Sequence, residues 1–181
     1  MPKKTAELAE KLSKFKISEE SYNKFESEMM ALGYTKEQSD KVILRCFSSN
    51  TVQALLKNHG KLVEYGYDCE KIAKMAAHNG GSKNLVAVIK HHQELKELDF
   101  TEEQIVSMAA NNGGAKNIEG VIKGRKDLLE LGYTLEQIKR IAGHDGGSKN
   151  LVAVIKHHQE LMGLDFTEEQ IVSMAANNGG A

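Results

Sequence analysis

The 181-residue sequence is poor in the residues that interrupt helices or form covalent and metal cross-links. Its single proline is Pro2, so no proline breaks a helix anywhere downstream. It has no tryptophan and only two cysteines, Cys46 and Cys69, which do not have the spacing of a zinc site. Two isolated thiols are typical of reduced cysteines, so we expect an intracellular protein with no bound metal or cofactor.

Long apolar runs and an excess of either charge are also missing. No apolar stretch reaches the roughly 20 residues that a membrane-spanning helix needs, so we expect no membrane partner. The Lys-rich start lacks the apolar region of a signal peptide. The formal net charge of −1 argues against general polyanion binding, so any nucleic-acid contact requires basic groups gathered on one face. No nucleophile–base pair, Walker loop or carboxylate pair recurs, and we expect no enzymatic activity.

The sequence does contain a 33-residue unit that is repeated along the chain. Complete copies begin at Tyr67, Phe100 and Tyr133, and a partial copy begins at Phe166. Residues 80–115 match residues 146–181 at 34 of 36 positions, which indicates duplication of a two-unit block. A fixed period of this length predicts an array of small stacked units, and we interpret the partial copy as the start of a longer array.

Each unit is predicted to form two helices. The first begins with a Thr-x-x-Gln capping box in three copies and with Asp68 as N-cap in the first complete copy. The second is expected from about Ser82 to Glu97 in that copy. The residues expected in the core of the complete units have helical spacing: Leu85, Val88, Ile89, Leu95, Ile105, Met108, Ala109, Ile118, Val121, Ile122, Leu128, Ile138, Ile141 and Ala142.

A degenerate unit precedes the complete ones. It begins at Tyr34 and keeps a Thr35-x-x-Gln38 box, but its loop from Arg45 to Ser49 lacks the paired glycines. Residues 32–66 carry five basic and three acidic groups, an excess of positive charge that favours contact with phosphate groups, by Arg45 among others, with little sequence preference. Atypical end units are typical of repeat arrays.

The fold class is therefore predicted to be all-α, a solenoid of 33-residue two-helix repeats. Residues 1–66 form degenerate cap repeats and residues 67–181 the regular repeats. The regular repeats are expected at 67–99, 100–132, 133–165 and, in part, 166–181.

Only two adjacent residues vary in the loop between the two helices of each unit. These pairs are His78-Asn79, Asn111-Asn112, His144-Asp145 and Asn177-Asn178, each followed by two glycines. Free N–H groups at a helix N-terminus attract phosphate oxygens, and a lysine recurs two residues after the second glycine. The groups predicted to bind phosphate are Gly80, Gly81, Lys83, Gly113, Gly114, Lys116, Gly146, Gly147 and Lys149.

The pairs themselves have two interpretations. His, Asn and Asp are good turn formers, so a lone pair indicates only a turn. Asparagine and aspartate also differ in which base edge they contact: a carboxylate accepts from cytosine N4, whereas an asparagine amide donates to purine N7. Repetition within a constant frame favours reading of one base by each unit.

The pattern Thr-x-Glu-Gln-Ile, the variable pair, Gly-Gly-x-Lys-Asn and a Leu/Val/Ile helix resembles the DNA-binding repeats of transcription-activator-like effectors and the wider TALE-like group. The resemblance covers residues 67–181 strongly and residues 32–66 weakly, and suggests a divergent bacterial or environmental member. It implies a monomer that winds as a right-handed superhelix in the major groove of double-stranded DNA, one repeat for each base. It also implies the bacterial cytoplasm or, for a secreted effector, the host nucleus as location.

The resemblance assigns a role to each member of the pair. The second residue contacts the base, which applies to Asn79, Asn112, Asp145 and Asn178. The first braces the loop, which applies to His78, Asn111, His144 and Asn177. The expected preferences are guanine, a purine, cytosine and a purine.

Two other repeat architectures compete with this interpretation. An ankyrin-like array that binds protein shares the 33-residue period, but its Thr-Pro-Leu-His signature is missing. An RNA reader would stack bases on aromatic or arginine side chains, and no aromatic residue lies near the Gly-Gly loops. The adjacent histidines His91-His92 and His157-His158 are expected on a solvated helix face.

Overall fold

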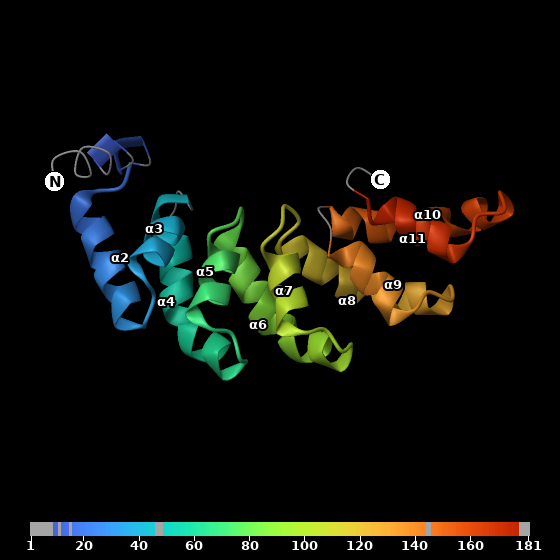
Figure 1. The fold of residues 1–181 in the computed structure, drawn as a ribbon, viewed down its shortest axis with the longest axis horizontal. Helices are drawn as coiled ribbons and strands as arrows, with labels where there is room; N and C mark the ends of the chain where they lie inside the picture. Colours follow the sequence, from blue (N-terminus) through green and yellow to red (C-terminus); the bar gives the residue numbers. More distant parts are fainter. Residues whose placement is uncertain (1–8, 11, 15, 46–48, 144–145, 178–181) are drawn as a thin grey trace. The chain divides into compact units, whose positions relative to one another are not determined.

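The computed structural model describes residues 9–10, 12–14, 16–45, 49–143 and 146–177, with only the backbone of Arg45 and Ser49. The described part is helical and contains no strand, which confirms the all-α class (Figure 1). Its helices are α2 (Glu19–Ala31), α3 (Lys36–Arg45), α4 (Ser49–Glu64), α5 (Cys69–Ala76), α6 (Gly81–Glu97), α7 (Glu102–Ala109), α8 (Ala115–Glu130), α9 (Leu135–Ala142), α10 (Gly147–Gly163) and α11 (Glu168–Ala175). None of them combines the length and hydrophobicity of a transmembrane span.

The chain forms two compact units that meet within α6, one up to Leu85 and one from Val86 onward. In the first unit, α2 packs on α3, and α3 contacts both α4 and α5. Helix α4, the second helix of the degenerate repeat, also packs against α5. The core of this unit consists of large side chains that are almost fully buried: Tyr22, Met29, Leu55, Leu62, Tyr67, Ile72 and Met75.

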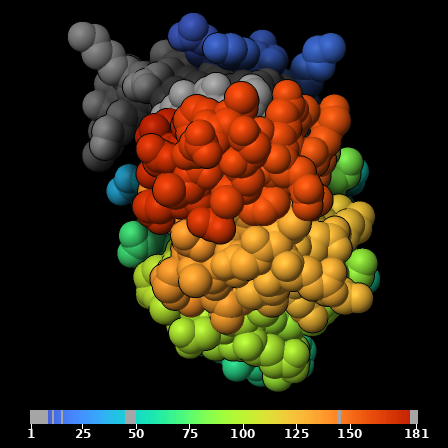
Figure 2. Space-filling view, turned by 90° about the vertical axis from the view of Figure 1, so that its right-hand side faces the viewer, coloured from blue at the N-terminus to red at the C-terminus, as the bar shows by residue number. Residues whose placement is uncertain are grey.

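In the second unit, equivalent helices of successive repeats lie against each other. The first helices α9 and α11 are in contact, and the second helices α8 and α10 lie side by side. In Figure 2, α10 and α11, in orange-red to red, lie directly against the orange and yellow part of the chain that precedes them. Stacking of equivalent helices is the arrangement of a helical repeat solenoid, in which each repeat buries the apolar stripe of its neighbour.

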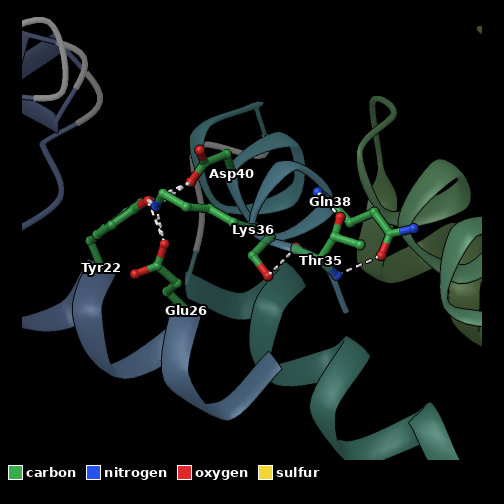
Figure 3. A network of polar contacts seen from close by, with 7 residues as sticks. Tyr22, Glu26, Thr35, Lys36, Gln38 and Asp40 are labelled. Atoms are coloured by element: carbon green, nitrogen blue, oxygen red, sulfur yellow. Dashed lines mark hydrogen bonds and ion pairs between the residues drawn. The ribbon is translucent and has the colours of Figure 1, made fainter. Parts of the chain in front are cut away.

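The predicted helix starts are confirmed. Thr101, Thr134 and Thr167 each form a complete capping box with the glutamine three residues later. The degenerate repeat has the same box: the Thr35 amide donates to Gln38 Oε1 at 2.8 Å, and the Gln38 amide donates to Thr35 Oγ1 at 3.2 Å (Figure 3). Local chemistry sets these boundaries, because each box satisfies amides that lack a partner within the helix.

The predicted core is confirmed with one systematic exception. Ile89 and Ile122, at equivalent places in two repeats, are only half-buried. The equivalent Ile155 is likewise half-buried and is one of the residues that line a groove between α8 and α10.

A polar network joins α2 to the degenerate repeat (Figure 3). The Tyr22 hydroxyl contacts Asp40 and lies 3.1 Å from Glu26 Oε1. Lys36 Nζ donates a hydrogen bond to the Tyr22 hydroxyl at 2.9 Å and also forms an ion pair with Glu26. Burial raises the pKa of Tyr22, and the hydrogen bond to Glu26 raises the pKa of Lys36. The residues preceding the repeats are therefore attached to them by a charged cluster as well as by apolar packing.

The expectation of a solvated face is wrong for most of the paired histidines. His91, His92 and His158 are each only 8% exposed. His158 Nδ1 lies 3.0 Å from the hydroxyl of Tyr133, and the two rings meet edge to face. Only His157 has an exposed imidazole, beside Glu160. The aromatic residue that opens a repeat and a histidine of its second helix therefore form a buried pair.

Candidate nucleic-acid interface

The two fully described variable pairs, His78-Asn79 and Asn111-Asn112, lie where the first helix of a repeat has ended and the second has not begun. Asn79 and Asn112, the second members of their pairs, are exposed. The first members, His78 and Asn111, are half-buried. Asn177 is exposed. The predicted site residues His144, Asp145 and Asn178 lie outside the described residues.

The two glycines have separate conformational roles. Gly80 and Gly146 both have φ of +78°, a left-handed conformation that a side chain disfavours. The second glycine is required by close approach: a Cβ on Gly81 would lie 2.1 Å from the carbonyl oxygen of Ala76, and one on Gly147 would lie 2.6 Å from that of Ala142. The constancy of the Gly-Gly pair thus has a folding reason that does not depend on a ligand.

The loop of repeat 100–132 takes a different form. Its left-handed residue is the second glycine, Gly114, at φ +47°, so α8 begins one residue later than α6 and α10 relative to the repeat. Asn111 Oδ1 accepts hydrogen bonds from the Gly113 amide at 3.1 Å and the Gly114 amide at 3.3 Å. Because these amides have an acceptor within the chain, a phosphate near this loop has to compete with Asn111 for them or be bound by Lys116.

Asn111 also reaches the next repeat. Its Nδ2 lies 3.5 Å from the carbonyl oxygen of Gly143, in the loop of the following unit. The first member of this pair therefore contacts both its own loop and the neighbouring one.

A buried asparagine lies beneath every described Gly-Gly loop, and sequence reasoning assigned it no role. Asn84, Asn117 and Asn150 follow the recurrent lysine, and none is more than 3% exposed. A polar residue at a constant place on an otherwise apolar helix face was the signal that could have found them.

These asparagines form hydrogen bonds to the loop backbone and to the adjoining repeats. Asn84 Nδ2 donates to the carbonyl oxygen of Asn79 at 3.2 Å, which anchors the loop behind that exposed side chain. Asn117 Nδ2 donates to Asn111 Oδ1 at 2.6 Å, and its Oδ1 accepts from the Ser148 amide of the next repeat at 2.9 Å. Asn150 Nδ2 donates to the carbonyl oxygen of Ala175, also in the next repeat, at 2.7 Å.

The predicted phosphate-binding lysines are exposed and lie at the start of the second helices. Lys83 is on α6, Lys116 on α8 and Lys149 on α10. Arg45 is the last residue of α3, and its side chain is outside the described part. Among the described residues, no group of three or more His, Cys, Asp or Glu side chains is placed to hold a metal ion.

The fold and the loops define a class of protein: helical repeats in which a variable polar pair precedes a glycine turn, as at His78-Asn79 and Asn111-Asn112. Within this class, residues 145–177 match the TAL effector repeat family, over the length of one unit. This match supports a TALE-like repeat protein, and the TAL effector repeat family is one of non-enzymatic, DNA-binding repeats. No curated protein matches the chain.

Proposed function

We propose that this protein binds double-stranded DNA sequence-specifically, with one repeat for each base pair in the major groove. The observation that carries the proposal is the difference between the two asparagines in the loop of repeat 100–132. Asn112 is exposed at the turn, whereas Asn111 Oδ1 accepts hydrogen bonds from the amides of Gly113 and Gly114 and from Asn117 Nδ2. An exposed polar group on a braced turn presents one side chain to one base edge.

The identity of each pair, first and second residue together, then sets the preference of each repeat. Read from the N- to the C-terminus as 5′ to 3′, Asn79 selects guanine, Asn112 a purine, Asp145 cytosine and Asn178 a purine. A carboxylate only accepts hydrogen bonds, so Asp145 favours the N4 amino group of cytosine and is repelled by guanine O6 and N7. His78, His144 and Asn177 brace their loops in the same role as Asn111.

The backbone contacts are sequence-independent in this proposal. Lys83, Lys116 and Lys149 meet the phosphates together with the amides of Gly80, Gly81, Gly146 and Gly147, and Arg45 does so in the degenerate repeat. Successive packed helices are separated by about 8–10 Å, whereas base pairs rise about 3.4 Å per step. A right-handed superhelix around the duplex reconciles these two spacings. The protein acts as an intracellular monomer.

The experiment that tests the proposal is Asp145→Asn. Four repeats supply limited affinity, so the repeats are embedded in a longer array or assayed at low salt. Competition binding is measured against four duplexes that differ only at the third position. We expect the substitution to change that preference from cytosine to purine, a difference of about 1–3 kcal/mol, and to leave the other positions unchanged.

The parent protein is the matched control, because the substitution exchanges one oxygen for an amide nitrogen. Identical ranking of the four duplexes by both proteins contradicts reading of one base by one residue. Absence of binding to any duplex would instead favour a protein-binding array of the ankyrin-like kind.

A further inference from the structure

The cations of the second unit divide into two equal groups. Five have a carboxylate within ion-pair distance: Lys96 with Glu102 (2.9 Å), Arg125 with Glu94 (3.4 Å), Lys126 with Glu130 (3.7 Å), Lys139 with Glu136 (2.7 Å) and Arg140 with Glu169 (2.5 Å). The other five, Lys90, Lys116, Lys123, Lys149 and Lys156, have none among residues 86–143 and 146–177. The division shows where this unit leaves positive charge uncompensated.

The uncompensated lysines occupy only two places in the repeat. Lys116 and Lys149 are the lysines that follow the glycine loops. Lys123 and Lys156 lie seven residues further along the same helices, and Lys90 occupies that second place on α6. Seven residues are close to two helical turns, so each helix carries its two lysines on one face, about 10 Å apart. All five are exposed.

Close packing of α8 on α10 brings the two helices' lysines onto one surface. A Cβ on Gly120 would lie 2.9 Å from Ser148 Cβ, so the helices approach closely at that point. A groove of about 540 Å³ runs between them, and Lys116, Lys123 and Lys156 are among the residues that line it. Its carboxylates, Glu119 and Asp127, do not pair with these lysines.

The degenerate repeat has a lysine at the second of these two positions but not at the first. Lys57 on α4 is the equivalent of Lys90 and Lys123, and it is exposed, with no ion pair among the described residues. The residue equivalent to Lys83 is Asn50, and the glycines and variable pair are absent there. A charge kept where the predicted base-reading loop is lost fits a sequence-independent role.

We propose that Lys90, Lys123 and Lys156 form a second lysine row that contacts the phosphate backbone of duplex DNA, beside the row that follows the glycine loops. The proposal rests on the DNA-binding function proposed above and extends its contact surface along the second helices. Lysine is a hydrated point charge, and each phosphate that it neutralises releases counterions. The row therefore adds affinity and salt dependence but no base preference.

The test compares three double variants that each remove two positive charges. Lys123→Gln with Lys156→Gln removes the second row in α8 and α10. Lys116→Gln with Lys149→Gln removes the first row there. The matched control, Lys96→Gln with Lys126→Gln, removes two lysines that are paired with carboxylates. Affinity for matched and mismatched duplexes is measured by fluorescence anisotropy over a range of low salt concentrations, and thermal unfolding verifies that each variant is folded.

We expect the second-row variant to bind matched and mismatched duplexes more weakly by the same factor. The slope of log affinity against log salt should fall by about 2, at roughly 0.9 for each lost phosphate contact. The control should keep the parent slope. An unchanged slope in the second-row variant, with a reduced slope in the first-row variant, overturns this inference and leaves the proposed function intact. Failure of the parent to bind any duplex overturns both.

Discussion

Each glycine that follows a variable pair is fixed by a separate backbone requirement. Gly80 takes a left-handed conformation, whereas Gly81 begins α6 against the carbonyl end of α5. The sequence analysis assigned the glycines to phosphate binding. The structure shows that the turn requires them even without DNA, so their recurrence is weak evidence of a ligand, and the exposed pair is stronger.

Gly81→Ala should lower the free energy of unfolding by about 1–3 kcal/mol, because overpacking against fixed backbone forces a local shift. The added methyl group would lie 2.1 Å from the Ala76 carbonyl oxygen and 2.8 Å from Thr51 Cγ2. The matched control is Gly60→Ala in the middle of α4, where nothing lies within 4 Å of the new Cβ.

Gly60→Ala should raise stability by about 0.5–1 kcal/mol, since alanine has the better helix propensity. Urea unfolding of both variants provides the comparison. Equal effects of the two substitutions would show that Gly81 is not under steric constraint.

At the scale of elements, the contact between the aromatic residue that opens a repeat and a histidine of its second helix recurs. In one repeat, both partners of this contact are replaced. Tyr34 Oη lies 2.9 Å from His59 Nδ1, and Tyr133 and His158 repeat this contact, each across 25 residues. In the repeat that opens with Phe100, the ring has no hydroxyl and the residue 25 positions later is Arg125, which pairs with Glu94 instead. The two members of the contact change together because a buried imidazole nitrogen needs a hydrogen-bond partner.

This contact predicts a pH dependence of stability in the first unit. Burial lowers the pKa of His59 below its ordinary value of 6.5. As the pH falls through about 6.5, the unfolded chain therefore binds a proton on His59 more readily than the folded chain does, and stability is lost toward acid. His59→Gln removes this titration.

The free energy of unfolding of His59→Gln should therefore fall less than that of the parent between pH 7.5 and pH 5.0. Chemical denaturation at the two pH values measures the difference. His157→Gln is the control, because that imidazole is 46% exposed and its Nδ1 lies beside Glu160 instead of a tyrosine hydroxyl. An acid-dependent loss identical in parent and His59→Gln would contradict the assignment.

At the scale of the whole molecule, the stacking of equivalent helices makes the repeat a modular unit. In the second unit, α8 contacts α10 and α9 contacts α11, and Asn117 and Asn150 each form a hydrogen bond to the next repeat. An added repeat can make the same contacts on both sides. The length of the proposed DNA site should therefore follow the number of repeats.

Insertion of a second copy of residues 100–132 after Gly132 should lengthen the recognised site by one base pair. The new position should select a purine, with about 1–3 kcal/mol of discrimination, because the inserted loop carries Asn111-Asn112. Competition between duplexes with and without the additional purine measures the effect. A site whose length is unchanged, or increases by more than one base pair, contradicts the correspondence of one repeat to one base.

The sequence by itself determined the features that depend on local chemistry. The period gave the repeats, and the Thr-x-x-Gln boxes placed the starts of α7, α9 and α11, because capping involves groups within one helical turn. Spacing along each helix identified most of the core. The variable pairs were also visible in the sequence, because they change directly beside two glycines that recur in every regular repeat.

Only the tertiary structure decided which polar groups are buried and which cations remain uncompensated. The sequence analysis expected His92 and His158 on a solvated face, but the stack buries both. Asn117 received no role, yet it accepts from Ser148 in the next repeat. Lys123 and Lys126 are only three positions apart in the sequence, but within the part of the chain that the structure describes Lys126 alone of the two has a carboxylate partner. Burial and ion pairing depend on side chains from both the same helix and other repeats, and their relative placement is fixed only when the helices stack.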